Sequence, residues 1–289
     1  NANNPNPELQ ELSLYMVDGG DGVFSGNDYA LFYAKGPHSW AYKENEKRFV
    51  HTYNIYAEQS YYFLTVTPGA IGKRMQQVGY APANANYTVT SVDDFQFIET
   101  DQYNLVGSGR EWFGDLFDFK LSYDYVVQFP NIISDTAWIT ARAVARSTSS
   151  GTNMTFQVNT NPVTTLQFPA VSTNSGAPYA NADFNRVPFI PGASSLQIKV
   201  TYNNAINPSA TAWLDYIEVE ARRQLAISSN QIIFRDQKAY RAGGAAQYIV
   251  DNATASTRIW DVTNFNNQRV LPLQLSNNTA SFIAPSDTL

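Results

Sequence analysis

The chemistry open to this sequence is narrow, because it contains no cysteine and only two histidines, His38 and His51. Without a thiol there can be no cysteine nucleophile, no disulfide and no zinc-thiolate site. A serine or threonine nucleophile would need a histidine base that a carboxylate orients, and both histidines have aromatic surroundings instead. We expect His38 to cap a loop, His51 to lie on a strand, and the chain to have no catalytic residue.

Glu218 and Glu220 form the most plausible pair of carboxylates for acid–base chemistry. Residues two apart on a strand share one face and lie about 7 Å apart, which falls within the range that glycosidases use. Charged side chains in this pattern usually form a solvated strand face. We therefore predict that both glutamates are solvent-exposed and not catalytic.

Asp18, Asp21, Asn27 and Asp28 surround a glycine-rich turn with oxygen ligands of the kind that calcium prefers. Their spacing departs from that of an EF-hand loop, and no glutamate follows at the last ligand position. Hydrogen bonding in Asx turns explains the same residues. Structural calcium at Asp18, Asp21 and Asp28 is therefore one hypothesis, turn formation is the other, and no cofactor is certain.

Asp215 shares one face of its predicted strand with Trp213, Ile217 and Val219, so we predict that its carboxylate points into the protein. A buried carboxylate needs a cation or several hydrogen-bond donors. Jelly-roll carbohydrate-binding modules are similar here, because an aspartate of their final strand ligates structural calcium. The alternatives are hydrogen bonds to loop amides, or a bulge that inverts the face.

Trp138 is the best candidate for stacking on a sugar ring, with Trp40 second. Aromatic side chains on a β-sandwich can hold carbohydrate in this way. Packing against a neighbouring domain accounts for such tryptophans more often. A glycan ligand at Trp138 is thus a hypothesis weighed against interdomain packing.

The elements that must position these residues are predicted to be strands. The sequence has 18 Tyr, 17 Phe and 5 Trp, together with many Thr, Val and Asn. Apolar and polar residues alternate with a period of two at 137–146 and 196–202, as in half-buried antiparallel strands. Further strands are predicted at 12–17, 29–34, 48–53, 61–66, 123–129, 154–158, 163–168, 213–221, 246–250, 258–262 and 280–284. The fold class is therefore all-β.

Chain length and strand spacing predict three units. Residues 1–108 are expected to form an N-terminal β-domain that ends in a linker, with 93–118 as the least β-like segment. Residues 109–225 have the size and spacing of a jelly-roll-like β-sandwich. Residues 226–289 are expected to form a small β-subdomain that packs on a neighbour, because it is too small for a large core.

The formal net charge is −6, and the basic residues are scattered. Nucleic acid is not expected as a partner, because phosphate neutralisation needs a clustered basic face. No run of about 18 apolar residues exists, so we expect no membrane-spanning segment. The Asn- and Thr-rich loops and the low share of charged residues are typical of exported bacterial β-proteins, which predicts a secreted protein.

Three motifs together resemble one family. Residues 24–37, followed by Trp40 and 61–65, are similar to the N-terminal region of the PorU-like sortases, the gingipain-type peptidases of type IX secretion in Bacteroidetes. Glu99, Asp101 and Asn104 with 108–114 resemble a second motif of that region, and 259–263 resemble a third. The resemblance implies that a gingipain-like cysteine peptidase domain begins just beyond Leu289.

In that family a cysteine nucleophile is paired with a histidine, and neither can be carried over to this sequence. The resemblance therefore implies a non-catalytic accessory region of a peptidase that removes C-terminal sorting signals from exported cargo and attaches the cargo to surface lipopolysaccharide. Its implied partners are its own peptidase domain and other type IX secretion components, and its implied location is the outer membrane or cell surface. The alternative is a carbohydrate-binding jelly-roll module of a surface protein.

Overall fold

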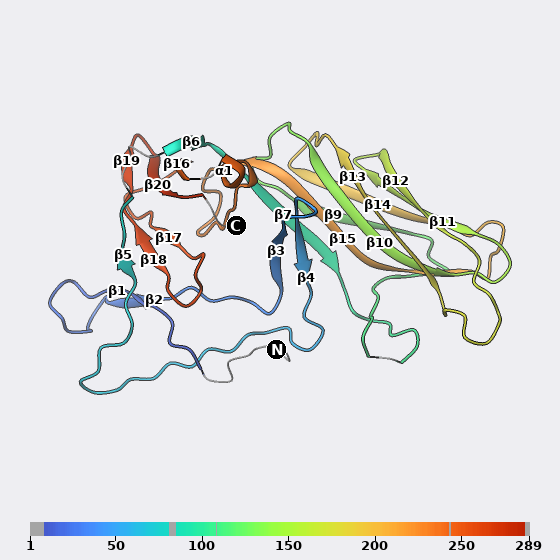
Figure 1. Cartoon of the computed structure of the whole chain (residues 1–289), viewed down its shortest axis with the longest axis horizontal. Coiled ribbons are helices and arrows are strands. Elements are labelled where there is room, and N and C mark those ends of the chain that lie inside the picture. The colour runs from blue at the N-terminus through green and yellow to red at the C-terminus, as the bar shows by residue number, and fades with distance from the viewer. Residues whose placement is uncertain (1–8, 81–84, 108, 243, 287–289) are drawn as a thin grey trace.

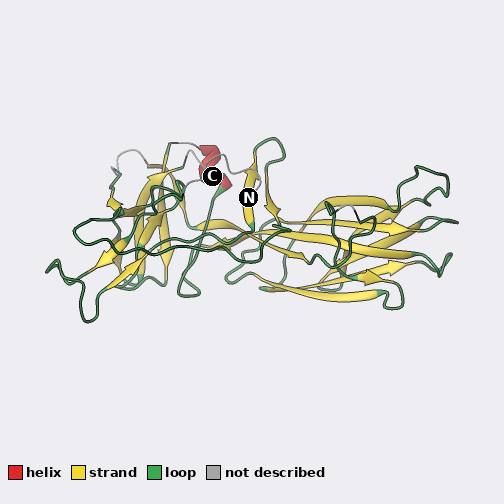
Figure 2. Ribbon diagram, turned by 90° about the horizontal axis from the view of Figure 1, so that it is seen from below, coloured by secondary structure: helices red, strands yellow, loops and turns green. Residues whose placement is uncertain are grey.

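The computed structural model describes residues 9–80, 85–107, 109–242 and 244–286. It is an elongated molecule built almost wholly of strands, with long strands at one end and shorter ones at the other (Figures 1 and 2). The all-β prediction is confirmed. Among the described residues the helix is a single short one, α1 (Gln237–Ala242), and none is long and apolar enough to cross a bilayer.

The long strands form a β-sandwich. One sheet has the order β13-β10-β15-β7, with β8 beside β15, and the other has the order β12-β11-β14-β9. The strands are β7 (Ser91–Glu99), β8 (Leu116–Phe117), β9 (Ser122–Gln128), β10 (Ala137–Arg146), β11 (Thr152–Val158), β12 (Asn161–Phe168), β13 (Asn181–Phe189), β14 (Ser195–Asn203) and β15 (Thr211–Gln224). The two sheets enclose a core in which residues such as Ile139, Phe156 and Ile198 are fully buried. The two-residue alternation predicted this sandwich because every second side chain enters the core.

A β-bulge in β15 decides which way its side chains point. The pairing with β10 shifts there, so that Ala143 lies opposite Leu214 but Arg142 lies opposite Tyr216. Asp215 is the extra residue of the bulge. Ala212 and Leu214 face the core before the bulge, and Ile217, Val219 and Ala221 face it afterwards. The prediction that Asp215 shares an inward face with Trp213 and Ile217 is therefore wrong, because the bulge inverts the alternation.

The shorter strands form two small sheets at the other end. One has the order β19-β20-β16-β6 and the other the order β17-β18-β5. The strands are β5 (Gln76–Gln77), β6 (Ala85–Val89), β16 (Ala245–Asp251), β17 (Ile259–Asp261), β18 (Arg269–Leu271), β19 (Gln274–Ser276) and β20 (Thr279–Pro285). They share a core that includes Val89, Tyr248, Leu271 and Phe282. This C-terminal core is thus completed by strands from the N-terminal third of the chain.

The N-terminal third also forms two hairpins, β1 (Tyr15–Val17) with β2 (Tyr29–Leu31) and β3 (Ser39–Lys43) with β4 (Arg48–Thr52). The expected linker over 93–118 is wrong in its first part, because β7 lies there and pairs with β15. The expected strand at 61–66 is also wrong, since that segment pairs with no strand and is largely exposed. The predicted domain boundary at 108/109 would place β7 and its pairing partner β15 in different domains.

A buried ion-pair network joins the sandwich to the C-terminal sheets. Arg222 of β15 contacts Asp93 of β7 and Asp236, the residue that precedes α1. Asp236 also accepts hydrogen bonds from the backbone N–H groups of Lys238 and Ala239. These bonds satisfy N–H groups at the start of the helix that have no intrahelical partner. The network therefore positions α1 and the strands that follow it.

Candidate interaction site

The outer face of β15 is covered by the β3–β4 hairpin, which buries the two glutamates that we predicted to be exposed. Glu218 is 1% exposed and Glu220 is 7% exposed. Glu220 accepts hydrogen bonds from the backbone N–H of Phe49 at 3.0 Å and from Arg186 at 2.9 Å. Arg48 donates to Glu218 at 2.9 Å. The prediction of a solvated face is wrong because a hairpin about 170 residues earlier in the chain covers it.

His51 lies on β4, as predicted, and both of its ring nitrogens contact carboxylates. Nδ1 lies 2.6 Å from Glu218, and Nε2 contacts Glu99. Burial by itself lowers the pKa of His51, but the hydrogen bonds to Glu218 and Glu99 outweigh burial and raise the pKa to about 9. His51 is therefore positively charged at neutral pH and holds two glutamates together, an arrangement that leaves no free nitrogen for general-base chemistry.

His38 is accounted for by its loop. Its Nδ1 accepts a hydrogen bond from the backbone N–H of Asn54 at 3.1 Å, and its ring stacks on Tyr53 with centroids 4.2 Å apart. This is the capping role that the sequence predicted. Neither histidine is thus arranged as the base of a catalytic triad.

Of the four aspartates proposed as calcium ligands, Asp18, Asp21 and Asp28 lie between β1 and β2, whereas Asp215 lies on β15 of the sandwich. In the turn after β1, Asp18 accepts a hydrogen bond from the backbone N–H of Gly20, and Asp21 accepts one from Val23. Asp28 accepts one from Ser25. The bonds to Asp18 and Asp21, from the N–H two residues later, are the Asx-turn bonds of the alternative hypothesis, whereas Asp28 accepts from a residue that precedes it. In the described part of the chain, no three acidic, histidine or cysteine side chains form a group that could hold a metal ion.

Asp215 is 6% exposed and forms an ion pair with Arg142, which also contacts Glu111 at 3.2 Å. Burial raises the pKa of Asp215 to about 6, and the attraction of Arg142 only partly offsets this rise. The cation that the sequence argument required for a buried carboxylate is therefore an arginine on the adjacent strand.

Trp138 lies on β10, where the guanidinium of Arg186 stands over its ring at 4.0 Å from the centroid. Arg186 is held there by its bond to Glu220. Trp40, on β3 of the hairpin, packs against Phe95 of β7, with ring centroids 4.4 Å apart. Both tryptophans thus make packing contacts within the chain.

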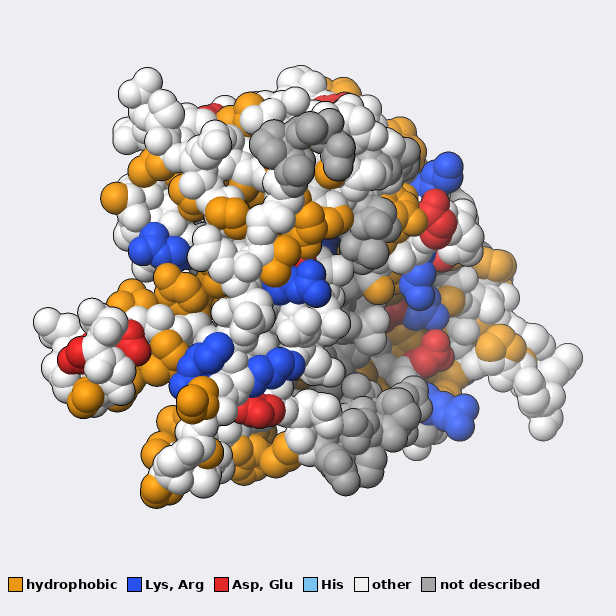
Figure 3. All heavy atoms as spheres, turned by 60° about the vertical axis from the view of Figure 1, so that its left-hand side comes forward, with side chains coloured by type: hydrophobic (Ala, Val, Ile, Leu, Met, Phe, Trp, Pro, Cys, Tyr) orange, Lys and Arg blue, Asp and Glu red, His pale blue; other side chains and the backbone are white. Residues whose placement is uncertain are grey.

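Two extended segments of the N-terminal third carry more than half of the large hydrophobic side chains that the described residues expose. We call this surface the apolar arm. It contacts itself through Phe32 and Tyr62, whose ring centroids are 5.5 Å apart, and the Tyr62 hydroxyl donates to the Lys35 carbonyl at 2.7 Å. The exposed side chains of the arm are Val23, Phe24, Tyr29, Leu31, Phe32, Ile55, Tyr56, Tyr61, Tyr62, Phe63, Leu64, Val66 and Ile71. Figure 3 shows hydrophobic side chains over this end of the molecule, with basic side chains among them.

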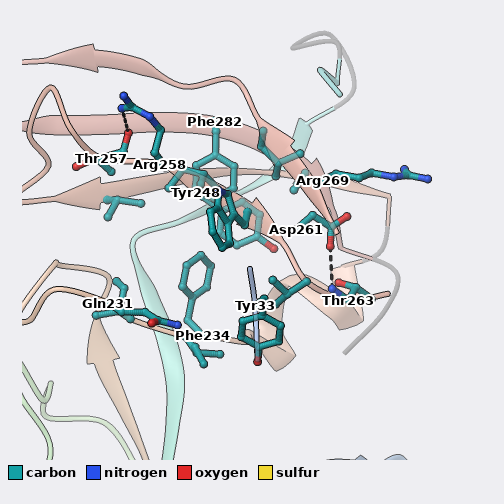
Figure 4. A pocket seen from close by; sticks show the side chains of 18 of the residues that line it. Tyr33, Gln231, Phe234, Tyr248, Thr257, Arg258, Asp261, Thr263, Arg269 and Phe282 are labelled. Atoms are coloured by element: carbon teal, nitrogen blue, oxygen red, sulfur yellow. Dashed lines mark hydrogen bonds between the residues drawn. The ribbon is translucent and has the colours of Figure 1, made fainter. Parts of the chain in front are cut away.

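Beside the arm lies a cavity of about 1090 Å³. Its walls come from residues 31–34, from 227–236, from the strands β16 and β20, and from β17 with the loop that follows it. The aromatic side chains of Tyr33, Phe234, Tyr248 and Phe282 gather in it, with Arg258 and Arg269 on either side of them (Figure 4). Asp261 is occupied by a hydrogen bond from the backbone N–H of Thr263 at 3.0 Å.

Sequence reasoning found neither the arm nor the cavity as a site. Its only signal was the family resemblance, because residues 24–37, 61–65 and 259–263 lie in the arm and in the cavity wall. The cavity joins segments from opposite ends of the chain, and no local pattern marks such a meeting. Glu99 and Asn104 of the remaining motif lie elsewhere. Glu99 is the last residue of β7 and contacts His51, and Asn104 donates a hydrogen bond to the Glu111 carbonyl at 3.2 Å.

No protein-family model and no curated protein matches this chain. Among solved structures, it is similar to dimeric latent PorU from Porphyromonas gingivalis, with a TM-score of 0.79 over 96% of this chain and 19% identity. The chain spans 26% of the length of that PorU chain. It is also similar to a CBM36 carbohydrate-binding module in complex with calcium and xylotriose, with a TM-score of 0.28 over 45% of this chain and 99% of that chain and 15% identity. A family 35 carbohydrate-binding module from an environmental isolate matches with a TM-score of 0.30 over 51% of this chain and 98% of that chain, at 18% identity. The chain therefore has a PorU-like fold.

Proposed function

We propose that this chain is a non-catalytic interaction region of a secreted gingipain-type cysteine peptidase, a PorU-like sortase of type IX secretion. The observation that carries the proposal is the likeness in fold to PorU, which extends over 96% of this chain with a TM-score of 0.79. In this proposal the region works at the cell surface together with the peptidase domain of the same protein and with other secretion components.

The apolar arm supports a packing role for this region. Soluble proteins rarely expose large contiguous apolar surfaces unless those surfaces contact a partner. Phe63, Leu64 and Val66 are each more than three-quarters exposed, although they lie next to one another in the chain. We infer that the arm packs against the peptidase domain, which removes these side chains from water and limits access to the catalytic cleft.

The absence of a nucleophile–base pair supports the non-catalytic part of the proposal. The sequence has no cysteine, and both of its histidines are held in structural contacts. We expect the isolated chain to cleave neither arginyl nor lysyl substrates nor sorting signals. The carbohydrate-binding alternative has no comparable support, because Arg186 already stands over the ring of Trp138.

Hydrogen exchange tests the packing role. Backbone amides at 55–71 should exchange fast in the isolated chain and at least tenfold more slowly in the whole peptidase, because docking removes them from water. Residues 204–207, in the turn between β14 and β15 of the sandwich, serve as the internal control and should exchange alike in both. Equal exchange of 55–71 in the two proteins would contradict the proposed contact.

A further inference from the structure

The wall of the cavity includes a strand, β17, that pairs on one side only among the strands of the described residues. β17 is the outer strand of the β17-β18-β5 sheet, and residues 259–264 line the cavity. An outer strand presents backbone N–H and C=O groups that another extended chain can bind. Apolar side chains line the same cavity, among them Tyr33, Phe234 and Phe282. A strand edge with apolar pockets beside it is the arrangement by which proteins bind extended peptides.

Positive charge surrounds the same cavity. Arg235 and Arg258 line it. Lys35 directly follows the lining residues 31–34, and its ammonium lies 4.8 Å from the centroid of Phe265. Arg258 donates to Tyr15 and to the backbone carbonyls of Ala255 and Thr257, and Arg235 donates to the Phe234 carbonyl. Within the part of the chain that the structure describes, none of the three forms an ion pair with a carboxylate.

The acidic residues of the cavity offset only part of this charge. Asp236 is buried and paired with Arg222 at the start of α1, whereas Asp261 accepts a hydrogen bond from the Thr263 backbone and keeps its negative charge. Arg235 and burial both lower the pKa of Lys35, burial being the larger cause. Two cations that repel each other at the edge of a cavity are stabilised when an anion binds between them. The repulsion stands out in a chain whose formal net charge is −6.

From these features we infer that the cavity binds an extended peptide segment with alternating acidic and apolar side chains. Its backbone adds to the edge of β17, its apolar side chains enter among the aromatic rings, and its carboxylates meet Lys35, Arg235 and Arg258. Side chains of a strand alternate between two faces, so one peptide can present both kinds of group. This inference concerns the cavity and does not depend on the proposed contact of the apolar arm.

The experiment starts from a phage-displayed library of random dodecapeptides selected on the 289-residue chain. We expect enrichment of peptides in which acidic and apolar residues alternate. The selected peptide is then synthesised with a fluorophore, and its affinity is measured by fluorescence anisotropy. The double variant Lys35→Gln/Arg235→Gln should weaken binding by about tenfold or more, because it removes two charge contacts. Lys199→Gln, which removes one exposed cation from β14 of the sandwich, should change affinity less than twofold.

Strand addition is tested with two N-methylated forms of the same peptide. Alternate N–H groups of a strand point to opposite edges, so methylation of one set should abolish binding and methylation of the other set should be tolerated. Equal affinity of both methylated forms overturns strand addition. Failure to enrich any peptide, enrichment of basic peptides, or equal affinity for the wild type and the double variant overturns the inference as a whole. None of these results bears on hydrogen exchange of the arm in the whole peptidase.

Discussion

The carboxylate of Glu218 accepts two hydrogen bonds from His51, one from its backbone N–H at 2.9 Å and one from its Nδ1 at 2.6 Å. The neighbouring backbone N–H, that of Phe49, donates to Glu220 in the same manner. The outward edge of β4 is thus bound by side-chain carboxylates of β15 and not by another strand. Acidic side chains hold the hairpin on the sandwich, and they lose water when it docks.

Replacing Glu218 by glutamine should destabilise the protein by about 2 to 4 kcal/mol, because Arg48 and His51 would lose the buried carboxylate that they share and keep only Glu46 and Glu99 as anionic partners. Urea unfolding measures the loss. The control is Glu46→Gln, since Glu46 also contacts Arg48, at 2.6 Å, but its side chain is 43% exposed. That change should cost less than about 1 kcal/mol. Similar losses in both variants would show that burial of Glu218 is not decisive.

Charge on His51 should make stability depend on pH above neutrality. The pKa of His51 is about 9 in the folded protein and 6.5 in the unfolded chain, so its stabilising effect is complete below pH 6.5. The effect declines between pH 6.5 and 9 and is lost above pH 9, a change on the order of 3 kcal/mol. Urea unfolding at several pH values should show this decline in the wild type but not in His51→Gln. If the unfolding free energies of the wild type and His51→Gln change with pH in the same way, the raised pKa of His51 is contradicted.

Asp215 should have the opposite relation between charge and stability. Burial raises its pKa from 3.8 to about 6, so the folded state favours the protonated form. Stability from this group is therefore greatest below pH 3.8 and falls as pH rises to 6, by roughly 2 to 3 kcal/mol. Asp215→Asn should lack that decline. The difference in unfolding free energy between wild type and variant at pH 4 and pH 7 measures it, and an unchanged difference would contradict a raised pKa.

Calcium at Asp18, Asp21, Asp28 or Asp215 stays an untested hypothesis, and thermal melting with calcium or EDTA tests it. We expect both melting curves to coincide, because three of these carboxylates accept turn N–H groups and Asp215 is paired with Arg142. If EDTA lowers the melting temperature, comparison of Asp18→Asn with Asp215→Asn locates the ion. The variant that no longer responds to EDTA contains the altered ligand.

Trp138→Ala should destabilise the protein by about 1 to 3 kcal/mol, because it removes packing and the cation–π contact with Arg186. The binding profile on a glycan array should not change, since we expect no specific glycan to bind the wild type. A specific glycan that binds the wild type and not Trp138→Ala would favour the carbohydrate-binding alternative over the proposed function.

Local sequence determined much about the strands of the sandwich. The alternation at 137–146 predicted β10 with its observed bounds, and 196–202 predicted β14 to within one residue at each end. These strands were predictable because every second side chain of each enters the core between the two sheets. The lack of cysteine likewise excluded thiol chemistry without any structure.

Tertiary structure alone decided which polar faces are buried and where the cavity lies. The alternation in β15 separates its two faces but contains no information on what covers the outer one. Glu218 is buried because the β3–β4 hairpin packs there, and the direction of Asp215 depends on a bulge opposite Arg142 and Ala143. The cavity is lined jointly by residues 31–34 and by β17, segments that lie more than 200 residues apart in the sequence. Periodicity reports how a segment meets its immediate surroundings, whereas contacts between distant segments depend on the packing of the whole chain.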